Sequence, residues 1–240
     1  MIPEPFYIST CGAGKVSVRW QQRPEIEMQR LYLIRGGQGC FLRPDGTTEP
    51  FARDTFYVFP HNLKARFFSD PADPIDHVFF DFLSAPPIVA PQPLVYPAQS
   101  APLRAMGALL TAVWRSEPPQ DQRKRLGMQL LRTALTLLDD DAPLPYCADG
   151  AVCAALDVMH SRYAEPISIA RLASSLHFEE NYFIRRFRSV MGQTPYAYLR
   201  AYRLMRAAEL LARGGMPAQV AAQVGYENPS SLSRALRGRG

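Results

Sequence analysis

The feature that most constrains the fold is a pattern that occurs twice near the end of the chain. The segment 166–192 has apolar residues at helical spacing, a short turn at 177–179, and then a second run at helical spacing. The segment 216–237 repeats the small-residue helix, the turn and the second helix, with Gly225 where a positive φ is often needed. Such a repeat is much more specific than either copy alone. We therefore predict two helix-turn-helix units in an all-α region.

The second helix of the first unit is predicted to have one buried and one exposed face. Phe183 and Phe187 are four residues apart and define the buried face. Polar and charged side chains dominate the opposite face, which carries Asn181, Ile184, Arg185 and Arg188. In the major groove of DNA, arginine can bind O6 and N7 of guanine, and asparagine can bind N6 and N7 of adenine. The pattern therefore favours contact with base edges.

A long helix is predicted between the two units. Thr194 suits its N-cap, Pro195 suits its first position, and Gly214-Gly215 suits its end. A length of roughly 18 residues corresponds to about 27 Å. Once the widths of the units are included, such a helix can separate them by about 34 Å, one turn of the double helix. Arg203 and Arg206 on this helix are predicted to be structural or solvated rather than base readers.

The positive charge of the chain is concentrated in the same region. The 240 residues carry a net charge of +5. Residues 151–240 contain 12 arginines, no lysine and six acidic residues, a net charge of +6. Residues 1–150 contain 15 basic and 16 acidic residues, a net charge of −1. This asymmetry favours a polyanionic partner for the C-terminal part alone.

Residues 151–237 resemble the DNA-binding domain of the AraC/XylS family of bacterial regulators. The positions that carry the resemblance are Ile167, Leu172-Ala173, Tyr182-Phe183, Arg185, Phe187-Arg188, Gly192-Gln193-Thr194-Pro195, Tyr198-Leu199, Arg203-Leu204, Ala207, Leu210-Leu211, Val224-Gly225-Tyr226, Ser230 and Ser233-Arg234-Ala235. In that family, two units joined by a long helix insert recognition helices into successive major grooves on one face of DNA. The resemblance implies a sequence-specific transcription regulator that binds double-stranded DNA, with RNA polymerase as a partner if it activates transcription.

The resemblance also assigns contacts by position. The base-facing candidates are Asn181, Ile184 and Arg185 in the first unit, and Pro229, Ser230, Ser233 and Arg234 in the second; Arg188 and Arg237 suit phosphates. Ile184 stands where a polar residue is commoner in the family. The family normally continues past the second recognition helix with a closing segment, whereas this sequence stops at Gly240. In addition, Leu236 stands where the family usually has Phe. We therefore expect the second unit to be less stable, and DNA binding to rest more on the first.

The first part of the chain has the pattern of short strands. Apolar bursts predict strands at 28–34, 39–43, 54–60, 64–69 and 77–83, with a tight turn at Pro44-Asp45-Gly46. Strands at this spacing favour a sandwich or a small barrel. The expected fold class is an α+β multidomain chain, with a β-rich, cupin-like barrel and a helical pair followed by an all-α double helix-turn-helix domain. The expected boundaries are 1–97 for the cupin-like part, 98–138 for the helical pair, 139–150 for a linker and 151–240 for the DNA-binding domain.

The loose similarity of residues 1–97 to the family's effector-binding domain implies a small-molecule effector. Tyr32, Phe41, Tyr57 and His61 are candidates for lining its site. Alternate residues of a strand face opposite sides, so the sequence leaves open which aromatic residues point inward. For each aromatic residue taken alone, a place in the hydrophobic core is the favoured prediction, whereas His61 is predicted to lie in a loop or to line the pocket.

An apolar stripe at helical spacing marks the second helix of the pair, with Leu126, Leu130, Ala134 and Leu137. It either packs on the strands or forms the seam of a homodimer. We favour the homodimer, because the resembled family often dimerises through helices in this position.

Other classes of protein have weaker support. The four cysteines form no C-x2-C pair, and the β-rich part has two histidines, His61 and His77, with no H-x-H motif. No catalytic triad or phosphate-binding loop is recognisable, so we expect neither enzyme activity nor a metal or cofactor. The lack of a long apolar run or a secretion signal favours the cytoplasm and no membrane partner. Two alternatives stay open: a cupin-type metalloenzyme with an appended helical domain, and a regulator with degenerate DNA binding that acts through a protein partner.

Overall fold

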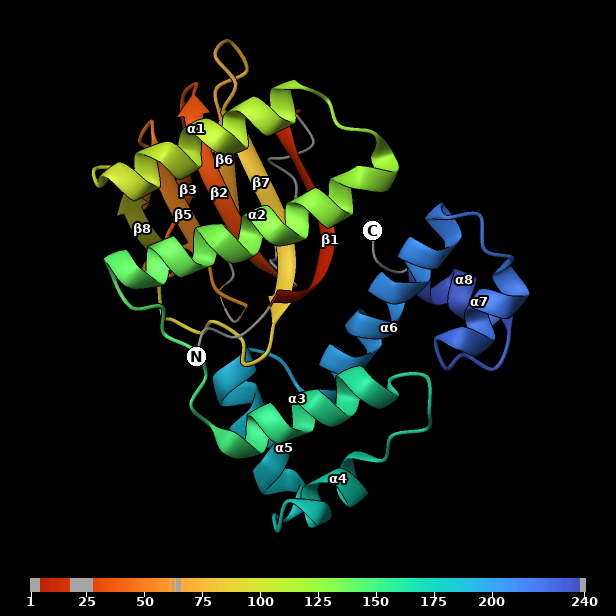
Figure 1. The fold of residues 1–240 in the computed structure, drawn as a ribbon. Helices are drawn as coiled ribbons and strands as arrows, with labels where there is room; N and C mark the ends of the chain where they lie inside the picture. The colour runs from red at the N-terminus through yellow and green to blue at the C-terminus, as the bar shows by residue number, and fades with distance from the viewer. Residues whose placement is uncertain (1–4, 18–27, 62, 64–65, 238–240) are drawn as a thin grey trace. The chain divides into compact units, whose positions relative to one another are not determined.

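The computed structural model describes residues 5–17, 28–61, 63 and 66–237. The chain divides into two compact units, 1–147 and 148–240. The first unit combines two antiparallel sheets with two helices, and the second is helical throughout its described part (Figure 1). The expected fold class, a β-rich part followed by an all-α part, is confirmed.

The strands of the first unit form two open sheets. The five-stranded sheet has the order β1-β7-β2-β5-β8, and the three-stranded sheet has the order β4-β3-β6. The elements of the unit are β1 (Pro5–Lys15), β2 (Gln29–Gly36), β3 (Gly39–Leu42), β4 (Thr48–Pro50), β5 (Thr55–Phe59), β6 (Arg66–Ser69), β7 (Asp76–Ser84), β8 (Leu94–Pro97), α1 (Ala101–Arg115) and α2 (Gln120–Asp141).

Strands occur at each predicted position, although residues 64 and 65 lie outside the described residues. Among the described strands, neither edge of the larger sheet, β1 or β8, pairs with a strand of the smaller sheet. The sandwich is therefore the form that this unit takes, rather than a closed barrel. In the turn after β3, Gly46 has a φ of 87°, as the Pro-Asp-Gly sequence predicts.

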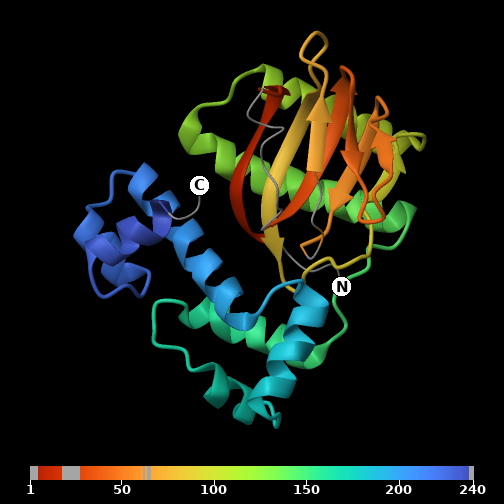
Figure 2. The same cartoon turned by 180° about the vertical axis from the view of Figure 1, so that it is seen from behind.

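Both faces of the five-stranded sheet are covered. On β2, Leu31 packs in the cluster that includes α1 and α2, whereas Tyr32 packs in the cluster that includes the smaller sheet. On β5, Val58 and Phe59 divide in the same way. The view in Figure 1 shows α1 and α2 crossing in front of the sheet, and Figure 2 shows the strands from behind. The unit therefore has three layers: helices, a large sheet and a small sheet.

The predicted stripe on α2 is displaced by one position from the face that the structure buries. Ala134 is buried, whereas Leu126, Leu130 and Leu137 are half-buried on its flank. The buried face also holds three leucines of the same helix, which pack in the cluster of α1 and the five-stranded sheet: Leu131, Leu135 and Leu138. Packing on the strands is thus observed, and the homodimer stays a prediction.

The segment expected to be a linker, 139–150, differs in structure from a free polar connection. Residues 139–141 continue α2 to its end. Further on, the amide of Val89 donates to the carbonyl of Pro145 at 3.0 Å, and the amide of Cys147 donates to the carbonyl of Pro87 at 2.8 Å. These backbone bonds hold 145–147 against the β-rich unit, because an extended strand-like segment can satisfy its polar groups there.

The second unit consists of α3 (Gly150–Arg162), α4 (Ile169–Ser175), α5 (Glu180–Met191), α6 (Pro195–Ala212), α7 (Pro217–Gln223) and α8 (Pro229–Arg237). The helix α6 connects the pair α4–α5 to the pair α7–α8 (Figure 1). It begins after Thr194, whose side chain accepts a hydrogen bond from the amide of Ala197, and Pro195 is its first residue. These are the caps that the sequence predicts. No helix in the described part of the chain is both long and apolar enough to cross a membrane.

Candidate DNA-binding surface

The turn between α4 and α5 is built by local hydrogen bonds. His177 holds the left-handed conformation that closes α4, with a φ of 62°. The carboxylate of Glu179 accepts hydrogen bonds from the amides of Asn181 and Tyr182 at 2.9 and 2.8 Å. These amides keep the pKa of Glu179 below its ordinary value and satisfy donors at the start of α5. The direction in which α5 leaves the turn is thereby fixed.

The helix α5 has the two faces that the sequence predicts. Phe183, Phe187 and Met191 are buried, and the aromatic rings of Phe187 and Tyr198 are 5.8 Å apart. Asn181, Arg185 and Arg188 are exposed, whereas Ile184 is half-buried. The buried side chains anchor the helix, so the exposed side chains project from a fixed support.

The second helix-turn-helix pair, α7–α8, has a similar arrangement. The turn before α8 contains Gly225 with a φ of 76°, and the side chain of Asn228 accepts a hydrogen bond from the amide of Ser231 at 2.8 Å. Leu232 is the fully buried residue of α8, and Leu236 is half-buried. The candidate contacts on α8 are all exposed: Pro229, Ser230, Ser233, Arg234 and Arg237.

The arginines of this unit fall into two groups. In the first group the guanidinium is held within the protein, by Asp149 for Arg186, by Glu165 for Arg162, by Glu209 for Arg206 and Arg213, and by backbone carbonyls for Arg203. Of the two roles that the sequence leaves open for Arg203 and Arg206, structural or solvated, the structure shows the structural one. The second group is exposed and forms no ion pair with the residues that the structure describes: Arg171, Arg185, Arg188, Arg200, Arg234 and Arg237. This second group leaves positive charge available to a polyanion.

Arg186 is a site residue that the sequence did not single out. Its Nε lies 2.8 Å from a carboxylate oxygen of Asp149, and its guanidinium lies over the ring of Phe178. Asp149 also caps α3 by accepting a hydrogen bond from Val152. One carboxylate thus joins the start of α3 to α5. Because the partners are 37 residues apart, no local pattern in the sequence reveals this link.

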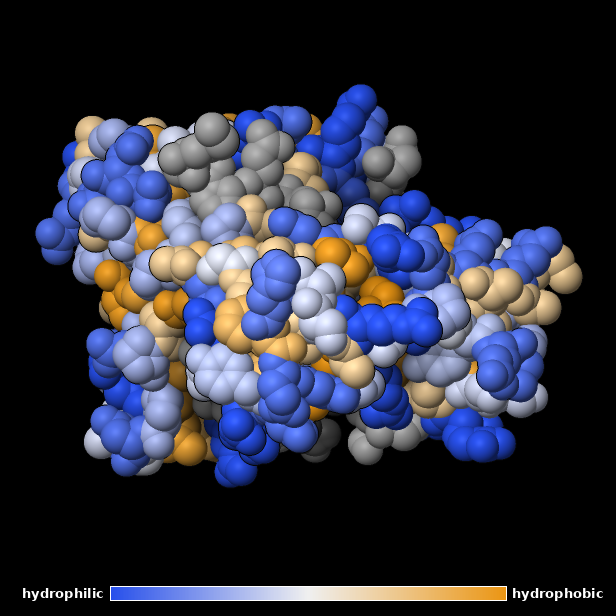
Figure 3. Space-filling model, turned by 90° about the horizontal axis from the view of Figure 1, so that it is seen from below, coloured by the Kyte–Doolittle hydropathy of each residue, from blue (hydrophilic) through white to orange (hydrophobic). Residues whose placement is uncertain are grey.

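The view from below Figure 1 shows the side on which α4 and α5 are drawn (Figure 3). Hydrophilic and apolar residues are interspersed on this face.

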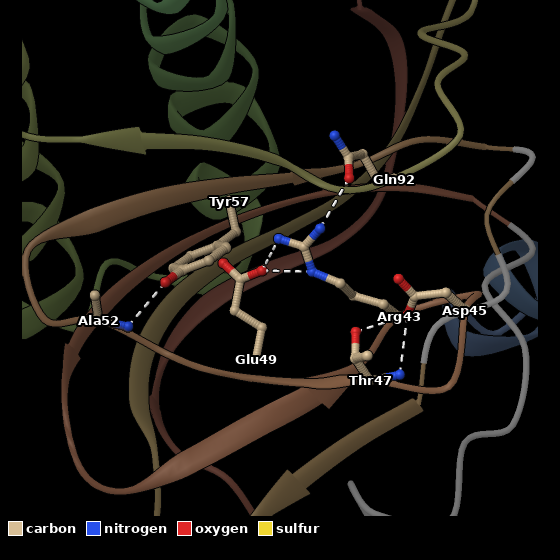
Figure 4. Close-up of polar contacts among 7 residues, drawn as sticks. All are labelled: Arg43, Asp45, Thr47, Glu49, Ala52, Tyr57 and Gln92. Atoms are coloured by element: carbon tan, nitrogen blue, oxygen red, sulfur yellow. Dashed lines mark hydrogen bonds and ion pairs between the residues drawn. The ribbon is translucent and has the colours of Figure 1, made fainter.

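The four effector candidates lie in the interior of the first unit. Tyr32, Phe41 and Tyr57 belong to the aromatic cluster between the two sheets, where the rings of Phe41 and Tyr57 are 5.9 Å apart. The hydroxyl of Tyr57 accepts a hydrogen bond from the amide of Ala52 at 2.8 Å (Figure 4). His61 is also buried, and burial lowers its pKa to about 4. All four therefore contribute to the core, and their contact with an effector stays a prediction.

Polar contacts brace the strands beside this cluster. The guanidinium of Arg43 pairs with the carboxylate of Glu49, and its Nη1 donates to the amide oxygen of Gln92 at 2.9 Å (Figure 4). Across the ranges that the structure describes, no three His, Cys, Asp or Glu side chains gather as ligands of a metal ion would. His77 instead lies with a ring nitrogen 3.2 Å from the carbonyl of Gly14.

Comparison with known proteins agrees with this geometry. Residues 172–239 match a family model described as a helix-turn-helix domain. Two AraC-like transcription regulators, from Streptomyces antibioticus and Streptomyces lividans, are 35% and 34% identical to the chain over 91 residues. In each case the match covers 38% of this chain and 30% of the relative. The second unit is therefore a helix-turn-helix domain.

The fold of the whole chain also has a counterpart among solved structures. ToxT from Vibrio cholerae superposes with a TM-score of 0.58 over 98% of this chain and 90% of its own, at 10% sequence identity. The two proteins thus share a fold. The chain thus combines a helix-turn-helix domain similar to those of AraC-like regulators with an N-terminal unit, in an overall fold that it shares with ToxT.

Proposed function

We propose that the chain is a sequence-specific DNA-binding transcription regulator, rather than an enzyme, whose N-terminal unit responds to a small molecule. The observation that carries the DNA-binding part is the pair α5 and α8. Three buried apolar residues anchor α5 and the buried Leu232 anchors α8, and each helix exposes arginines that form no ion pair with described residues. The proposed base contacts are Asn181, Ile184, Arg185, Pro229, Ser230, Ser233 and Arg234, and the proposed phosphate contacts are Arg188 and Arg237.

Replacing Arg185 by alanine should weaken binding to specific DNA by about 1–3 kcal/mol, or roughly 5- to 150-fold, because a paired contact to one base is lost. The probe is the duplex that the wild-type chain enriches from a random-sequence library. Affinity is measured by gel shift at several salt concentrations. Specificity should also relax at one base position of the enriched site.

The matched control is Arg162→Ala, which removes the same charge from an exposed arginine that is paired with Glu165. Its affinity for the enriched duplex should stay within about twofold of wild type, since a surface ion pair contributes little. Equal losses in the two variants would show that only net charge matters. If the wild-type chain enriches no sequence, the alternative of a regulator that acts through a protein partner gains support.

The proposed effector is a small carboxylic acid held in the N-terminal unit, with Tyr32, Phe41, Tyr57 and His61 around it. ToxT supports this choice, because its solved structures include one bound to an unsaturated fatty acid and one bound to a naphthalenyl-butenoic acid. In this chain the interior between the two sheets is the aromatic part of the unit, with Phe41 fully buried. The aromatic side chains there would match the apolar part of such an acid.

Unsaturated fatty acids should raise the unfolding temperature of the first unit. Saturation to 100 times Kd stabilises a protein by about 2.7 kcal/mol, equivalent to roughly 5–10 °C for a unit of this size. Tryptophan fluorescence follows this unit selectively, because both tryptophans, Trp20 and Trp114, precede residue 148. Phe41→Leu should reduce the ligand-dependent shift, whereas Val95→Ala on the exposed part of β8 should not. A shift that is identical in both variants would contradict the proposed position.

Two further partners belong to the proposal. A homodimer could form through α1 and α2, where Leu109 is 48% exposed and the flank of α2 is half-buried. RNA polymerase would be a partner if the protein activates transcription. Sedimentation of the full chain at micromolar concentration tests the dimer, which a strictly monomeric chain would contradict.

A further inference from the structure

The two helix-turn-helix units are connected by more than the helix α6. Arg203, near the middle of α6, donates from Nε to the carbonyl of Tyr163 at 2.6 Å and from Nη2 to the carbonyl of Glu165 at 2.7 Å. These carbonyls belong to the turn that follows α3. Carbonyls at the end of a helix lack partners within the helix, and a cation there is favoured by the helix dipole. Arg203 thus fixes the end of α3 to α6.

The second helix-turn-helix pair, α7–α8, lies against the same turn. A Cβ added to Gly225 would lie 2.8 Å from the carbonyl oxygen of Ala164 and 3.2 Å from Cζ of Arg203. Glycine is therefore required at this position by close approach as well as by its positive φ. Arg206 adds to the contact, since its guanidinium lies over the ring of Tyr163. The turn 163–165, Arg203 and Gly225 together form a cluster that we call the spacing clamp.

The opposite end of α3 is tied to the first helix-turn-helix pair, α4–α5. Asp149, at the N-cap of α3, pairs with Arg186 of α5. The helix α3 is thus held at its start by α5, and at its end by the turn that precedes α8. The end of α3 also contacts α6 directly, where the rings of His160 and Tyr202 are 4.8 Å apart. The helix α3 is therefore a second connection between the pairs α4–α5 and α7–α8, and it restrains rotation about the short segments at the ends of α6.

We infer that the spacing clamp sets the distance and orientation between α5 and α8, and so determines which separation of two DNA half-sites the chain accepts. Arg203 and Gly225 are positioning residues in this inference, which rests on the proposed DNA binding. One base pair of B-DNA adds about 3.4 Å and turns the next half-site by roughly 35°. A rigid pair of helices should therefore discriminate strongly between spacings, whereas a loosely connected pair should adapt to them.

The test compares affinities across a series of duplexes that carry the enriched site with one to three base pairs inserted or removed between its halves. For the wild-type chain, duplexes with altered spacing should bind at least tenfold more weakly than the original duplex; we call this ratio of Kd values the spacing penalty. For Arg203→Met the spacing penalty should fall below threefold, and binding to the original duplex should also be weaker. Gly225→Ala should reduce the penalty in the same direction, because its Cβ displaces the turn from Ala164.

Two controls separate positioning from other effects. Arg213→Met removes an exposed arginine that follows the end of α6 and pairs with Glu209 of that helix, and both the affinity and the spacing penalty of the variant should match wild type. Arg185→Ala should lose affinity at every spacing and keep the wild-type penalty. Far-UV circular dichroism establishes that each variant is folded, and Arg203→Lys, which keeps the charge but can reach fewer carbonyls at once, should show an intermediate penalty. A folded Arg203→Met protein with the wild-type penalty would overturn the inference.

A measurement without DNA distinguishes this failure from failure of the proposed function. Spin labels attached through azide-bearing amino acids at the exposed positions Ser189 on α5 and Ser233 on α8 report the distance between the helices. The distance distribution should be narrow in the otherwise wild-type chain and at least twice as wide with Arg203→Met. If no duplex is enriched, the proposed function fails while this measurement still tests the clamp. An unchanged distribution would overturn the clamp whatever the chain binds.

Discussion

Replacing Phe187 by alanine should lower the free energy of unfolding of the second unit by about 3–5 kcal/mol. The side chain is fully buried on α5, and its ring centroid lies 5.9 Å from that of Phe183 and 5.8 Å from that of Tyr198. Removing it leaves a cavity where α5 packs against α6, and surrounding side chains fill such cavities only in part. Specific DNA binding should be lost with it, because α5 would no longer be held in place.

Urea unfolding followed by far-UV circular dichroism measures this loss, and tryptophan fluorescence on the same samples reports the first unit, which should be unaffected. The matched control is Tyr196→Ala, an aromatic residue of α6 that is 53% exposed and should cost less than about 1 kcal/mol. Similar losses in both variants, or a shift of the tryptophan transition with Phe187→Ala, would contradict the assignment of Phe187 to the core of the second unit.

The helical unit could be predicted closely because its signals are local. Thr194, Pro195 and Gly225 act within a few residues of their own positions, as caps or as a turn residue with positive φ. The helical period also assigns Phe183 and Phe187 to the buried face, since α5 has one face in the core and one face outside. The helical period and the capping residues therefore predict the same helices, and the structure contains them.

The β-rich unit was harder to predict, for the opposite reason. All five residues of β5 are buried, because its two faces meet helices and a second sheet respectively. Such a strand shows no alternation of polar and apolar residues, so the inward direction of Tyr32 and Tyr57 could not be read from the sequence. The strand β1 was missed because its sequence, PFYISTCGAGK, is rich in small and polar residues, which are not typical of strands. Its antiparallel backbone pairing with β7 makes it a strand despite this composition.

The contacts that organise the candidate site were also beyond the reach of sequence patterns. Arg203 reaches the carbonyl of Tyr163 across 40 residues, and Arg186 reaches Asp149 across 37. In the sequence Arg186 looks like its neighbours Arg185 and Arg188, and the pattern gives Arg203 no particular partner. Only the fold shows which groups each guanidinium contacts, and so which of them holds helices together.

The first unit contains a buried ion pair whose loss should have an effect as large as that of Phe187→Ala. Arg30 and Asp81 are opposite each other on β2 and β7, with Nε and a carboxylate oxygen 3.1 Å apart and both side chains 8% exposed. Arg30→Met removes a cation from beside a buried carboxylate and should cost roughly 3–5 kcal/mol of unfolding free energy. Urea unfolding followed by tryptophan fluorescence measures it, since Trp114 is buried in this unit.

The double variant Arg30→Met/Asp81→Leu should recover most of that loss. A buried ion pair contributes little net stability compared with apolar residues of similar volume, because both charges lose their hydration; breaking it is costly since one charge stays behind. Arg53→Met is the matched control in the same unit, since Arg53 and Asp54 are 77% and 75% exposed and their pairing should contribute less than about 1 kcal/mol. If the double variant were no more stable than Arg30→Met alone, the cost would lie in lost packing of the Arg30 side chain over Phe67 and not in the charge of Asp81.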